Sequence, residues 1–518
     1  MGKVQRVKKN GPKPEAIIEI ASTGIRLSVV EVLPTGRWNT LDRSDMPVNL
    51  GLDIFTGGSV KQNTISQCIQ ILSRYKEQLK SWGIEPADTS VIATAALRES
   101  RDKDSIIDRI FIRTGFVVRV IDGVEENRLM YLAVRECFND SKFNLENDDY
   151  MILEAGGGST EMMLLKKGSI VSAHSFRLGT ARIERQIGQG GAIDTARRFI
   201  QQFILNSKTL LSEEFNSLKL RSFIAVGKQA QIAALNVGHP VSTFLWEMPR
   251  QKFIEFVDEI QDYSVEECLA RFKIAYNDAA QMRVGLLIYK MFVEITNVAS
   301  VIVPETNLRE GALINKLAAP SEDLQRDLDR QITAGALTLL RKYHGDEEHA
   351  KFVADVSLKI FDALKSEIGL VERARVLLEV AATLHDIGIF IRMENHHEHS
   401  AYIISNSEFF GLTHNEITIV SQIAKYHRGH SNPQNDDHFQ MLPRSSRMAI
   451  LKLTAIIRIA DAIDRSHTQK FDQLKIAKQK DSLLIYTGNR HNTVLERQAL
   501  DEKGGIFESV FGYKVILS

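Results

Sequence analysis

The residues between Met151 and Glu161 combine a carboxylate with consecutive glycines, an arrangement suited to holding phosphate and a metal ion. An apolar stretch typical of a buried strand ends at Glu154, and it is followed by Gly156, Gly157, Gly158 and Ser159. Consecutive glycines let a backbone approach a ligand closely and adopt positive φ, so that their N–H groups can surround an anion. The neighbouring carboxylate is placed to hold Mg²⁺, because this ion prefers oxygen ligands and bridges to phosphate oxygens. A triple glycine by itself fits a hairpin turn without a ligand equally well.

A second copy of the pattern lies nearer the N-terminus, between Ala16 and Glu31. Glu19 stands where the first copy has Glu154, and the small residues Ala21, Ser22 and Thr23 stand where it has glycines. In both copies a second apolar stretch follows the turn, so each copy is typical of a hairpin. A repeated hairpin predicts two related lobes that face each other across a cleft, with one phosphate-binding loop from each.

Two further charged groups follow predicted strand ends in the N-terminal part. Arg98 comes just after the apolar stretch 90–94, where α/β proteins place ligand-binding groups. Glu125 and Glu126 open a predicted helix after the stretch 116–121. Acids in a first helical turn are usually only favourable with the helix dipole, and this explanation suffices for one of them. The second carboxylate is a candidate general base.

A separate set of candidate metal ligands lies in the C-terminal half. His349 begins an amphipathic helix, the adjacent His385 and Asp386 end another, and Asp461 lies in a third. A lone histidine or aspartate on an apolar helix is more often a satisfied core residue than a ligand. Imidazole and carboxylate groups from separate helices of a bundle can nevertheless converge on one divalent metal. Further histidines could hold a second metal: His396, His397, His399, His427 and His430.

Length and composition limit the class of protein to which these candidate sites can belong. At 518 residues the chain should form more than one domain, and its 44% hydrophobic and 25% charged residues are ordinary for a globular protein. Lys+Arg and Asp+Glu are equal at 65 each, which argues against recruitment to nucleic acid or an anionic membrane. We find no signal peptide and no stretch long and apolar enough to span a bilayer. The three cysteines form no CxxC pair, so we expect a cytoplasmic protein.

The order of the predicted elements divides the chain. Apolar strands alternate with helices through about residue 314, which predicts α/β architecture, and only helices follow from about 320 to 465. Short β-like stretches return near the C-terminus, at 482–486 and 513–517. The predicted parts are a basic solvated tail (1–14), a first lobe (15–130), a second lobe (131–317), a helical domain (318–470) and a small C-terminal α/β segment (471–518).

Six short motifs of the chain form a specific set: Ala93–Arg98, Gly123–Glu126, Gly156–Glu161, Leu308–Gly311, Arg392–Ser407 and Tyr426–Arg428. Together they make the chain resemble the exopolyphosphatase/guanosine pentaphosphate phosphatase (Ppx/GppA) family of the sugar kinase/actin-like ATPase superfamily. The helical part resembles the HD-domain metal phosphohydrolases that many longer members carry. The resemblance runs from about Ala16 to Ile463. It implies two ribonuclease H-like α/β lobes, an all-α HD-type domain and a small β-containing C-terminal segment.

The resemblance implies Mg²⁺-dependent hydrolysis of the terminal phosphate of polyphosphate or of guanosine pentaphosphate. By position, Glu126 would activate the attacking water, and Arg98 would neutralise the terminal phosphate. Gly156–Ser159, with Ser22 and Thr23 of the first hairpin, would bind phosphate, and Glu19, Glu154 and Glu161 would hold Mg²⁺. This division suits phosphoryl transfer, which needs positioning and charge neutralisation more than covalent help. Family members are often dimers, so a homodimer is expected.

The chain departs from the family pattern in four places, which leaves alternatives open. The family usually has Asp where this chain has Glu19 and Glu154, Asn-Ser where it has Thr23-Gly24, and Ser-Gly-Thr where it has Gln229-Ala230-Gln231. An extra methylene moves a carboxylate by roughly 1.5 Å, and a misplacement of about 1 Å in such a site can cost roughly a hundredfold in rate. Two alternatives therefore stand beside cleft catalysis. One is phosphohydrolysis of a nucleotide or alarmone at a divalent-metal site made by His349, His385, Asp386 and Asp461, and the other is a sensor that binds phosphate or an alarmone without turnover.

Overall fold

The chain folds into two compact units, residues 1–322 and 323–518. This computed structural model describes residues 13–33, 37–139, 141–187, 193–210, 218–318, 322–428, 433–471, 474–488 and 492–518. The predicted basic tail therefore lies outside the described residues, except that the first strand already begins at Lys13. In the part of the chain that is described, no helix combines the length and the apolar character needed to cross a bilayer.

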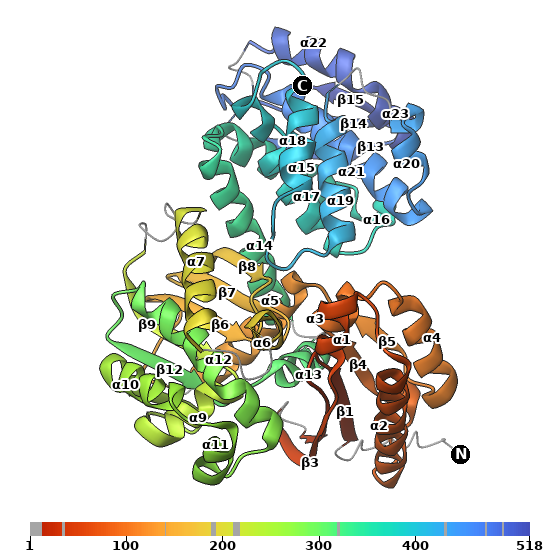
Figure 1. The fold of residues 1–518 in the computed structure, drawn as a ribbon. Coiled ribbons are helices and arrows are strands. Elements are labelled where there is room, and N and C mark those ends of the chain that lie inside the picture. Colours follow the sequence, from red (N-terminus) through yellow and green to blue (C-terminus); the bar gives the residue numbers. More distant parts are fainter. Residues whose placement is uncertain are drawn as a thin grey trace, which may run out of the picture. The chain divides into compact units, whose positions relative to one another are not determined.

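A five-stranded sheet forms the first lobe of the N-terminal unit (Figure 1). Its strand order is β3-β2-β1-β4-β5, with β1 antiparallel to β2 and parallel to β4. The strands are β1 (Lys13–Ile20), β2 (Gly24–Val32), β3 (Trp38–Pro47), β4 (Ser90–Ala93) and β5 (Val118–Val120). The helices are α1 (Leu50–Gly57), α2 (Gln62–Ser81), α3 (Ala95–Glu99), α4 (Lys103–Thr114) and α5 (Gly123–Phe138). The buried residues of α2 recur every three or four positions and so form one face of the helix. This face packs with β1 and β2 in one apolar core.

A seven-stranded sheet forms the second lobe. Its order is β10-β11-β12-β9-β6-β7-β8. The strands are β6 (Asp149–Ala155), β7 (Thr160–Lys166), β8 (Ser169–Phe176), β9 (Leu220–Val226), β10 (His239–Pro240), β11 (Leu245–Pro249) and β12 (Ser300–Pro304). The helices are α6 (Thr180–Ile187), α7 (Ile193–Leu210), α9 (Lys228–Val237), α10 (Arg250–Gln261), α11 (Val265–Phe272) and α12 (Tyr276–Glu294).

The two sheets share one topology, which extends the hairpin repeat seen in the sequence. In each sheet an antiparallel hairpin (β1–β2 or β6–β7) carries a third antiparallel strand on one side and two parallel strands on the other. The orders β3-β2-β1-β4-β5 and β8-β7-β6-β9-β12 therefore correspond strand for strand. The prediction of two related α/β lobes is confirmed at this level.

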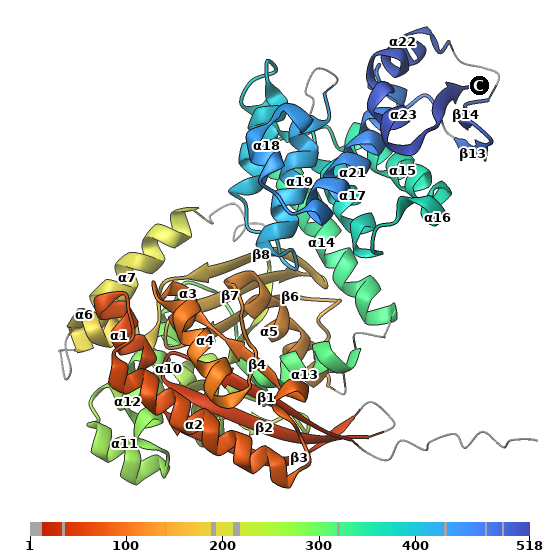
Figure 2. The same ribbon diagram turned by 90° about the vertical axis from the view of Figure 1, so that its right-hand side faces the viewer.

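Two helices connect the lobes. Helix α5 contacts β7 and β8 of the second sheet, and it also packs against α13 (Leu308–Ala318), which contacts β1 of the first (Figures 1 and 2). The close approach requires glycine: a Cβ on Gly311 would lie 2.0 Å from the carbonyl oxygen of Leu129. Residue 130, the predicted lobe boundary, falls inside α5. Because α5 spans the gap between the sheets, it positions its first turn, with Glu126, beside both hairpins.

The C-terminal unit is a helical bundle with a small sheet on the same core. Its helices are α14 (Glu322–Lys342), α15 (Glu347–Ala363), α16 (Lys365–Ile368), α17 (Arg373–Leu384), α18 (His396–Ser405), α19 (His414–Tyr426), α20 (Asp437–Gln440), α21 (Arg444–Ile463), α22 (Val494–Lys503) and α23 (Gly505–Phe511). Strands β13 (Lys475–Gln479), β14 (Ser482–Tyr486) and β15 (Lys514–Leu517) form the sheet. Leu483, Ile485 and Leu517 are buried in one cluster with α15, α17 and α21, so these strands complete the helical core.

Candidate functional site

A cavity of about 380 Å³ lies between the two lobes of the N-terminal unit. Both acidic hairpins line it, as the sequence predicts for a shared cleft, and so does Glu126 from the first turn of α5. The predicted residues that line it are Glu19, Ser22, Thr23, Glu126, Glu154, Gly156, Gly157, Gly158, Ser159 and Glu161.

The turns of the two hairpins touch each other at the glycines. A Cβ on Gly157 would lie 2.9 Å from Cγ2 of Thr23, and one on Gly158 would lie 2.8 Å from Cβ of Ala95. Side chains at these positions would push the lobes apart. Gly156–Gly158 are absent from the described positive-φ residues, so of the two properties that glycine permits, positive φ is not the one used here. Glycine is needed here because side chains of the first lobe pack directly against the backbone of Gly157 and Gly158.

Part of the predicted phosphate cradle is used inside the protein. The N–H of Gly156 donates to the carbonyl of Ser159 (2.9 Å) and closes the turn. The carbonyls of the three glycines accept hydrogen bonds from α6: from the N–H groups of Thr180 and Ala181, and from Arg182 Nε. Among the described hydrogen bonds, the N–H groups of Gly157, Gly158 and Ser159 have no acceptor. These three are the donors available to an anion.

The register of each hairpin decides what the acids face. In the first hairpin Glu19 lies opposite Arg26, whereas in the second hairpin Glu154 lies opposite Glu161. An acid facing a base across a strand pair is favourable, and two acids facing each other are unfavourable. Equivalent positions of the repeat therefore form an ion pair in one lobe and a pair of like charges in the other.

Glu19 is neutralised within the protein. Its Oε1 accepts from Nη1 of Arg26 (3.2 Å), and its Oε2 pairs with Nη1 of Arg309. Burial acts to raise the pKa of Glu19, but the two guanidinium groups outweigh it and lower the pKa. Both carboxylate oxygens thus have cationic partners, an arrangement that differs from the metal-ligand role that the resemblance implied.

Among the described residues, neither Glu154 nor Glu161 has a cationic partner of this kind. Burial, together with the charges of Glu19 and Glu126, raises the pKa of Glu154 to about 8. Burial and the charge of Glu126 also raise the pKa of Glu161 well above its usual range. Glu161 is held by Ser175 Oγ (2.8 Å) and Asn127 Nδ2 (3.2 Å). Two desolvated carboxylates that face each other have the charge and the oxygen ligands that suit one divalent cation such as Mg²⁺.

Arg98 forms an ion pair with Glu126, but of the two only Glu126 is among the residues that line the cavity. Nη1 of Arg98 donates to Oε1 of Glu126 and to the carbonyl oxygen of Ile121 (2.7 Å). Burial raises the pKa of Glu126 to about 7, although Arg98 acts in the opposite direction. A carboxylate with this pKa is half deprotonated near neutral pH, which is the range in which a general base works best.

Sequence reasoning assigned no role to several cleft residues. Arg26 and Arg309 neutralise Glu19, and Lys228 at the first turn of α9 pairs with Asp278 of α12. Arg26 could have been found by counting back across the hairpin from Glu19. Arg309 and Glu19 are far apart in the chain, so no local pattern joins them. Gln229 and Gln231, where the family has a different loop, also line the cavity.

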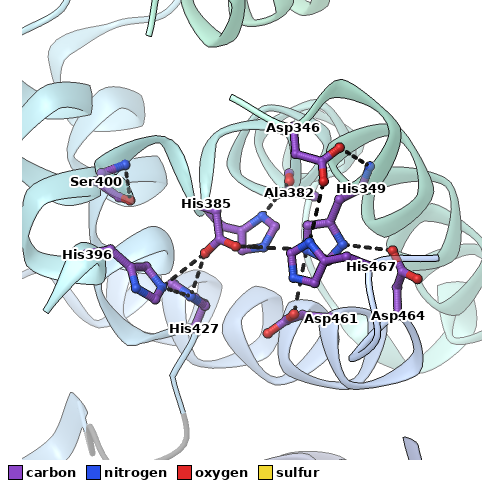
Figure 3. A network of polar contacts seen from close by, with 12 residues as sticks. Asp346, His349, Ala382, His385, His396, Ser400, His427, Asp461, Asp464 and His467 are labelled. Carbon is purple, nitrogen blue, oxygen red and sulfur yellow. Dashed lines mark hydrogen bonds and ion pairs between the residues drawn. The ribbon is translucent and has the colours of Figure 1, made fainter. Parts of the chain in front are cut away.

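The predicted metal ligands of the C-terminal unit converge from three helices (Figure 3). His349 comes from the first turn of α15, His385 and Asp386 follow α17, and Asp461 lies in α21. Nε2 of His349 lies 3.8 Å from Oδ1 of Asp461 and 3.9 Å from Oδ2 of Asp386. Within the described residues, the buried Nε2 atoms of His349 and His385 have no hydrogen-bond partner.

The protein fixes the tautomers of these rings. Nδ1 of His385 lies 2.8 Å from the carbonyl of Ala382, and Nδ1 of His427 lies 2.6 Å from that of Ala424. Nδ1 of His396 similarly contacts the carbonyl of Met393 (2.9 Å). Carbonyl oxygens only accept, so each Nδ1 carries the proton and each Nε2 presents a lone pair. Metal-binding histidines are usually oriented by this kind of outer hydrogen bond.

A second group of ligands shares Asp386. Its Oδ1 lies 3.1 Å from Nε2 of His396 and 3.2 Å from Nε2 of His427, while its Oδ2 lies 3.6 Å from Nε2 of His385. The Nε2 atoms of His396 and His427 are themselves 3.3 Å apart. Three lone-pair atoms at this separation repel one another unless a cation lies among them. Asp386 would help to hold a divalent cation together with either group of ligands.

Burial and the neighbouring carboxylates act in opposite directions on the imidazoles of this cluster. Burial acts to lower the pKa values of His349 and His396, but Asp464 and Asp386 outweigh it and raise them. Burial lowers the pKa of His385 to about 4, so its ring is neutral at physiological pH. Burial acts to raise the pKa of Asp461, but nearby Lys503 outweighs it and the pKa falls to about 2. Sequence reasoning did not assign Asp464, which contacts His349 Nδ1 at 2.8 Å, or Lys503. His430 lies outside the described residues.

Comparisons with known proteins agree with this organisation. A sequence model described as "Ppx/GppA phosphatase family" matches residues 29–319, and one described as "Ppx/GppA phosphatase, domain III" matches residues 330–503. The second is not an HD-domain model, so the HD-type identity of the helical unit stays a prediction.

Relatives cover most of the chain. A guanosine-5′-triphosphate,3′-diphosphate pyrophosphatase from Aeromonas hydrophila is 24% identical over 464 residues, covering 88% of this chain and 88% of that protein. One from Pseudoalteromonas translucida is 22% identical over 460 residues, covering 86% of each. The crystal structure of an exopolyphosphatase from Cytophaga hutchinsonii is 18% identical, with a TM-score of 0.53, and covers 59% of this chain and 98% of that one. This likeness shows that the fold is shared.

Proposed function

The chain belongs to the Ppx/GppA phosphatase family and is a hydrolase; from this premise we propose that its N-terminal cleft hydrolyses the terminal phosphoanhydride bond of polyphosphate, guanosine pentaphosphate or both. The observation that supports it most is the position of Glu126, a buried carboxylate with a pKa of about 7 beside a cradle of N–H donors in one cavity. Because the family is a phosphatase family, we set aside the hypothesis of a sensor without turnover.

Each residue of the cleft has a distinct role in the proposed reaction. Glu126 accepts the proton of the attacking water, and Arg98, held beside it, neutralises negative charge on the terminal phosphate. The N–H groups of Gly157, Gly158 and Ser159 hold the phosphate oxygens, with Ser22 and Thr23 on the opposite wall.

Glu154 and Glu161 are the residues that would hold Mg²⁺. When bound, the ion would neutralise charge on the phosphate oxygens. Glu19 has a different role in this proposal: with Arg26 and Arg309 it forms a buried ion network that fixes the first hairpin against α13.

Phosphate release from polyphosphate and from guanosine pentaphosphate, measured with Mg²⁺ and with Mn²⁺, tests the proposal. Glu126→Gln should lower kcat by roughly 10²- to 10⁴-fold, the usual contribution of a general base. Glu125→Gln is the matched control, because Glu125 is in the same helical turn but pairs with Arg119 away from the cavity. Equal activity of Glu126→Gln and Glu125→Gln would remove Glu126 from the mechanism.

The converging ligands of the C-terminal unit support a second candidate function. We propose that this unit binds two divalent ions: His349, His385, Asp386 and Asp461 would hold one, and Asp386, His396 and His427 would hold the other. Such ions would supply Lewis acidity and an activated water for hydrolysing a nucleotide or alarmone phosphate. The outer hydrogen bonds on Nδ1 hold the rings in place for this role.

Metal content distinguishes this site from the cleft. Purified wild type should contain two equivalents of divalent metal by mass spectrometry, and His385→Ala with Asp386→Ala should lose them. His414→Ala, an exposed histidine on α19 outside the cluster, is the control. Guanosine tetraphosphate hydrolysis that persists in Glu126→Gln and disappears in the double variant would assign activity to this unit. A wild type without bound metal, and without thermal stabilisation by Mn²⁺, would refute the assignment.

The homodimer and the cytoplasmic location stay predictions. Gel filtration with light scattering, and fractionation of cells, would test them.

A further inference from the structure

Helix α6 packs against the glycine turn of the cleft, residues Gly156–Gly158. Its first two backbone N–H groups donate to the carbonyl oxygens of Gly156 and Gly157, at 2.9 and 3.0 Å. The carbonyl oxygen of Gly158 accepts instead from a side chain, Nε of Arg182, at 2.6 Å. One helix therefore holds all three carbonyls of the turn.

Each of these carbonyls shares a peptide group with one donor of the proposed phosphate cradle. In a trans peptide the C=O and N–H bonds point in opposite directions. The peptide groups of the three carbonyls are those that contain the N–H groups of Gly157, Gly158 and Ser159, which have no acceptor among the described hydrogen bonds. Helix α6 thus fixes the direction in which the cradle donors point. Hydrogen bonds to the carbonyls also strengthen the N–H groups of the same peptides as donors.

Arg182 also joins this turn to the first lobe. Its Nη2 pairs with Glu99 at the end of α3, and its Cζ lies 3.9 Å from the ring centroid of Phe55 in α1. Helices α6 and α1 lie against each other (Figure 2). Arg98, which would neutralise the terminal phosphate, is the residue before Glu99. One guanidinium group therefore connects the cradle to the helix that carries Arg98.

We propose that Arg182 is a positioning residue of the cleft. It orients the Gly158–Ser159 peptide so that the N–H of Ser159 donates to the terminal phosphate, and it fixes this donor relative to Arg98. The inference deepens the proposed phosphatase function of the cleft and rests on it. The cradle holds the phosphate before the reaction as well as during it, so a misplaced donor weakens substrate binding more than the chemical step.

Steady-state kinetics with tripolyphosphate measure the effect. Arg182→Met keeps an unbranched side chain against Phe55 but removes every donor. Its KM should rise by roughly 10- to 150-fold, the value of one hydrogen bond to a charged group. Its kcat should change by less than about threefold. Arg182→Lys, which can still donate to the Gly158 carbonyl, should recover part of the loss. Arg185→Met is the matched control, because Arg185 is exposed in the same helix and donates to the carbonyl of Thr56 (3.3 Å).

A double variant tests the connection to the first lobe. If Glu99 acts through Arg182, Glu99→Leu should raise KM, and adding it to Arg182→Met should raise KM no further. Effects on KM that multiply would mean that the two residues act independently, and the connection to α3 would be wrong.

Three results overturn the role of Arg182: an unchanged KM in Arg182→Met, a loss confined to kcat, or the same rise of KM in Arg185→Met. If urea titrations show that Arg182→Met does not fold, Arg182→Lys decides: a raised KM supports the role, and an unchanged KM contradicts it. If wild type releases no phosphate, the proposed function fails, and equilibrium dialysis with tripolyphosphate decides the inference separately. Binding that Arg182→Met weakens and Arg185→Met does not supports the inference. Equal binding by wild type and Arg182→Met, or no binding by wild type, refutes it.

Discussion

Replacing Glu126 by glutamine should make the N-terminal unit more stable at alkaline pH while it removes activity. Glu126 is 7% exposed, and burial raises its pKa to about 7 from a model-peptide value of 4.5. Since the folded state favours the protonated form, the stability from this group is fully present below pH 4.5. It is lost as pH rises from 4.5 through about 7.

The shift sets the size of the effect. A difference of roughly 2.5 pKa units corresponds to about 3 kcal/mol at pH 8, since each unit is worth about 1.4 kcal/mol. Glutamine has a similar shape and no charge to desolvate. Glu126→Gln should therefore exceed the unfolding free energy of wild type by only about 1 kcal/mol at pH 5 and by up to about 3 kcal/mol at pH 8.

Tryptophan fluorescence isolates the relevant unit in urea titrations. The three tryptophans, Trp38, Trp82 and Trp246, all lie in residues 1–322. The titrations are run at pH 5 and pH 8 in EDTA and without phosphate. Under these conditions no bound metal or phosphate alters the energy of the buried Glu126 carboxylate. Glu125→Gln, which loses the ion pair to Arg119, should gain no stability between these pH values. If Glu126→Gln is destabilised equally at both pH values, desolvation does not raise the pKa of Glu126. The assignment of Glu126 as a perturbed base is then wrong.

Three other substitutions probe separate parts of the structure. Gly158→Ala should destabilise the unit by about 1–3 kcal/mol in urea titrations, because its Cβ meets Ala95 and Phe55 at 2.8 Å. Gly57→Ala, with nothing within 4 Å, should cost nothing. Asp464→Asn removes the carboxylate that orients His349, so it should weaken metal binding about 10- to 100-fold, measured in competition with a chelator dye. Asp346→Asn is the control: asparagine keeps the helix cap, so this variant should bind metal as wild type does. Arg309→Leu leaves Glu19 with one partner and should cost about 3–5 kcal/mol in urea, and a double variant with Glu19→Leu should recover much of it; no recovery would mean that the pair is not the source of the loss.

The sequence alone was enough to predict the α/β lobes, the repeated hairpins and the helical C-terminal region. Apolar periodicity and glycine-rich turns are local properties, so Glu19 and Glu154 could be recognised as equivalent before any contact was known. The order in which His349, His385, Asp386 and Asp461 occur likewise marked three helices as a candidate metal site.

Only the tertiary structure decided which acids have partners. Glu19 is neutralised by Arg26 through strand register and by Arg309 through the return of α13, whereas Glu154 faces Glu161. The roles of the glycines and of Asp386 also depend on distant elements, namely the opposing hairpin and the rings of His396 and His427. Electrostatic energy depends on distances between groups and on their burial, and chain spacing sets neither for residues on different elements.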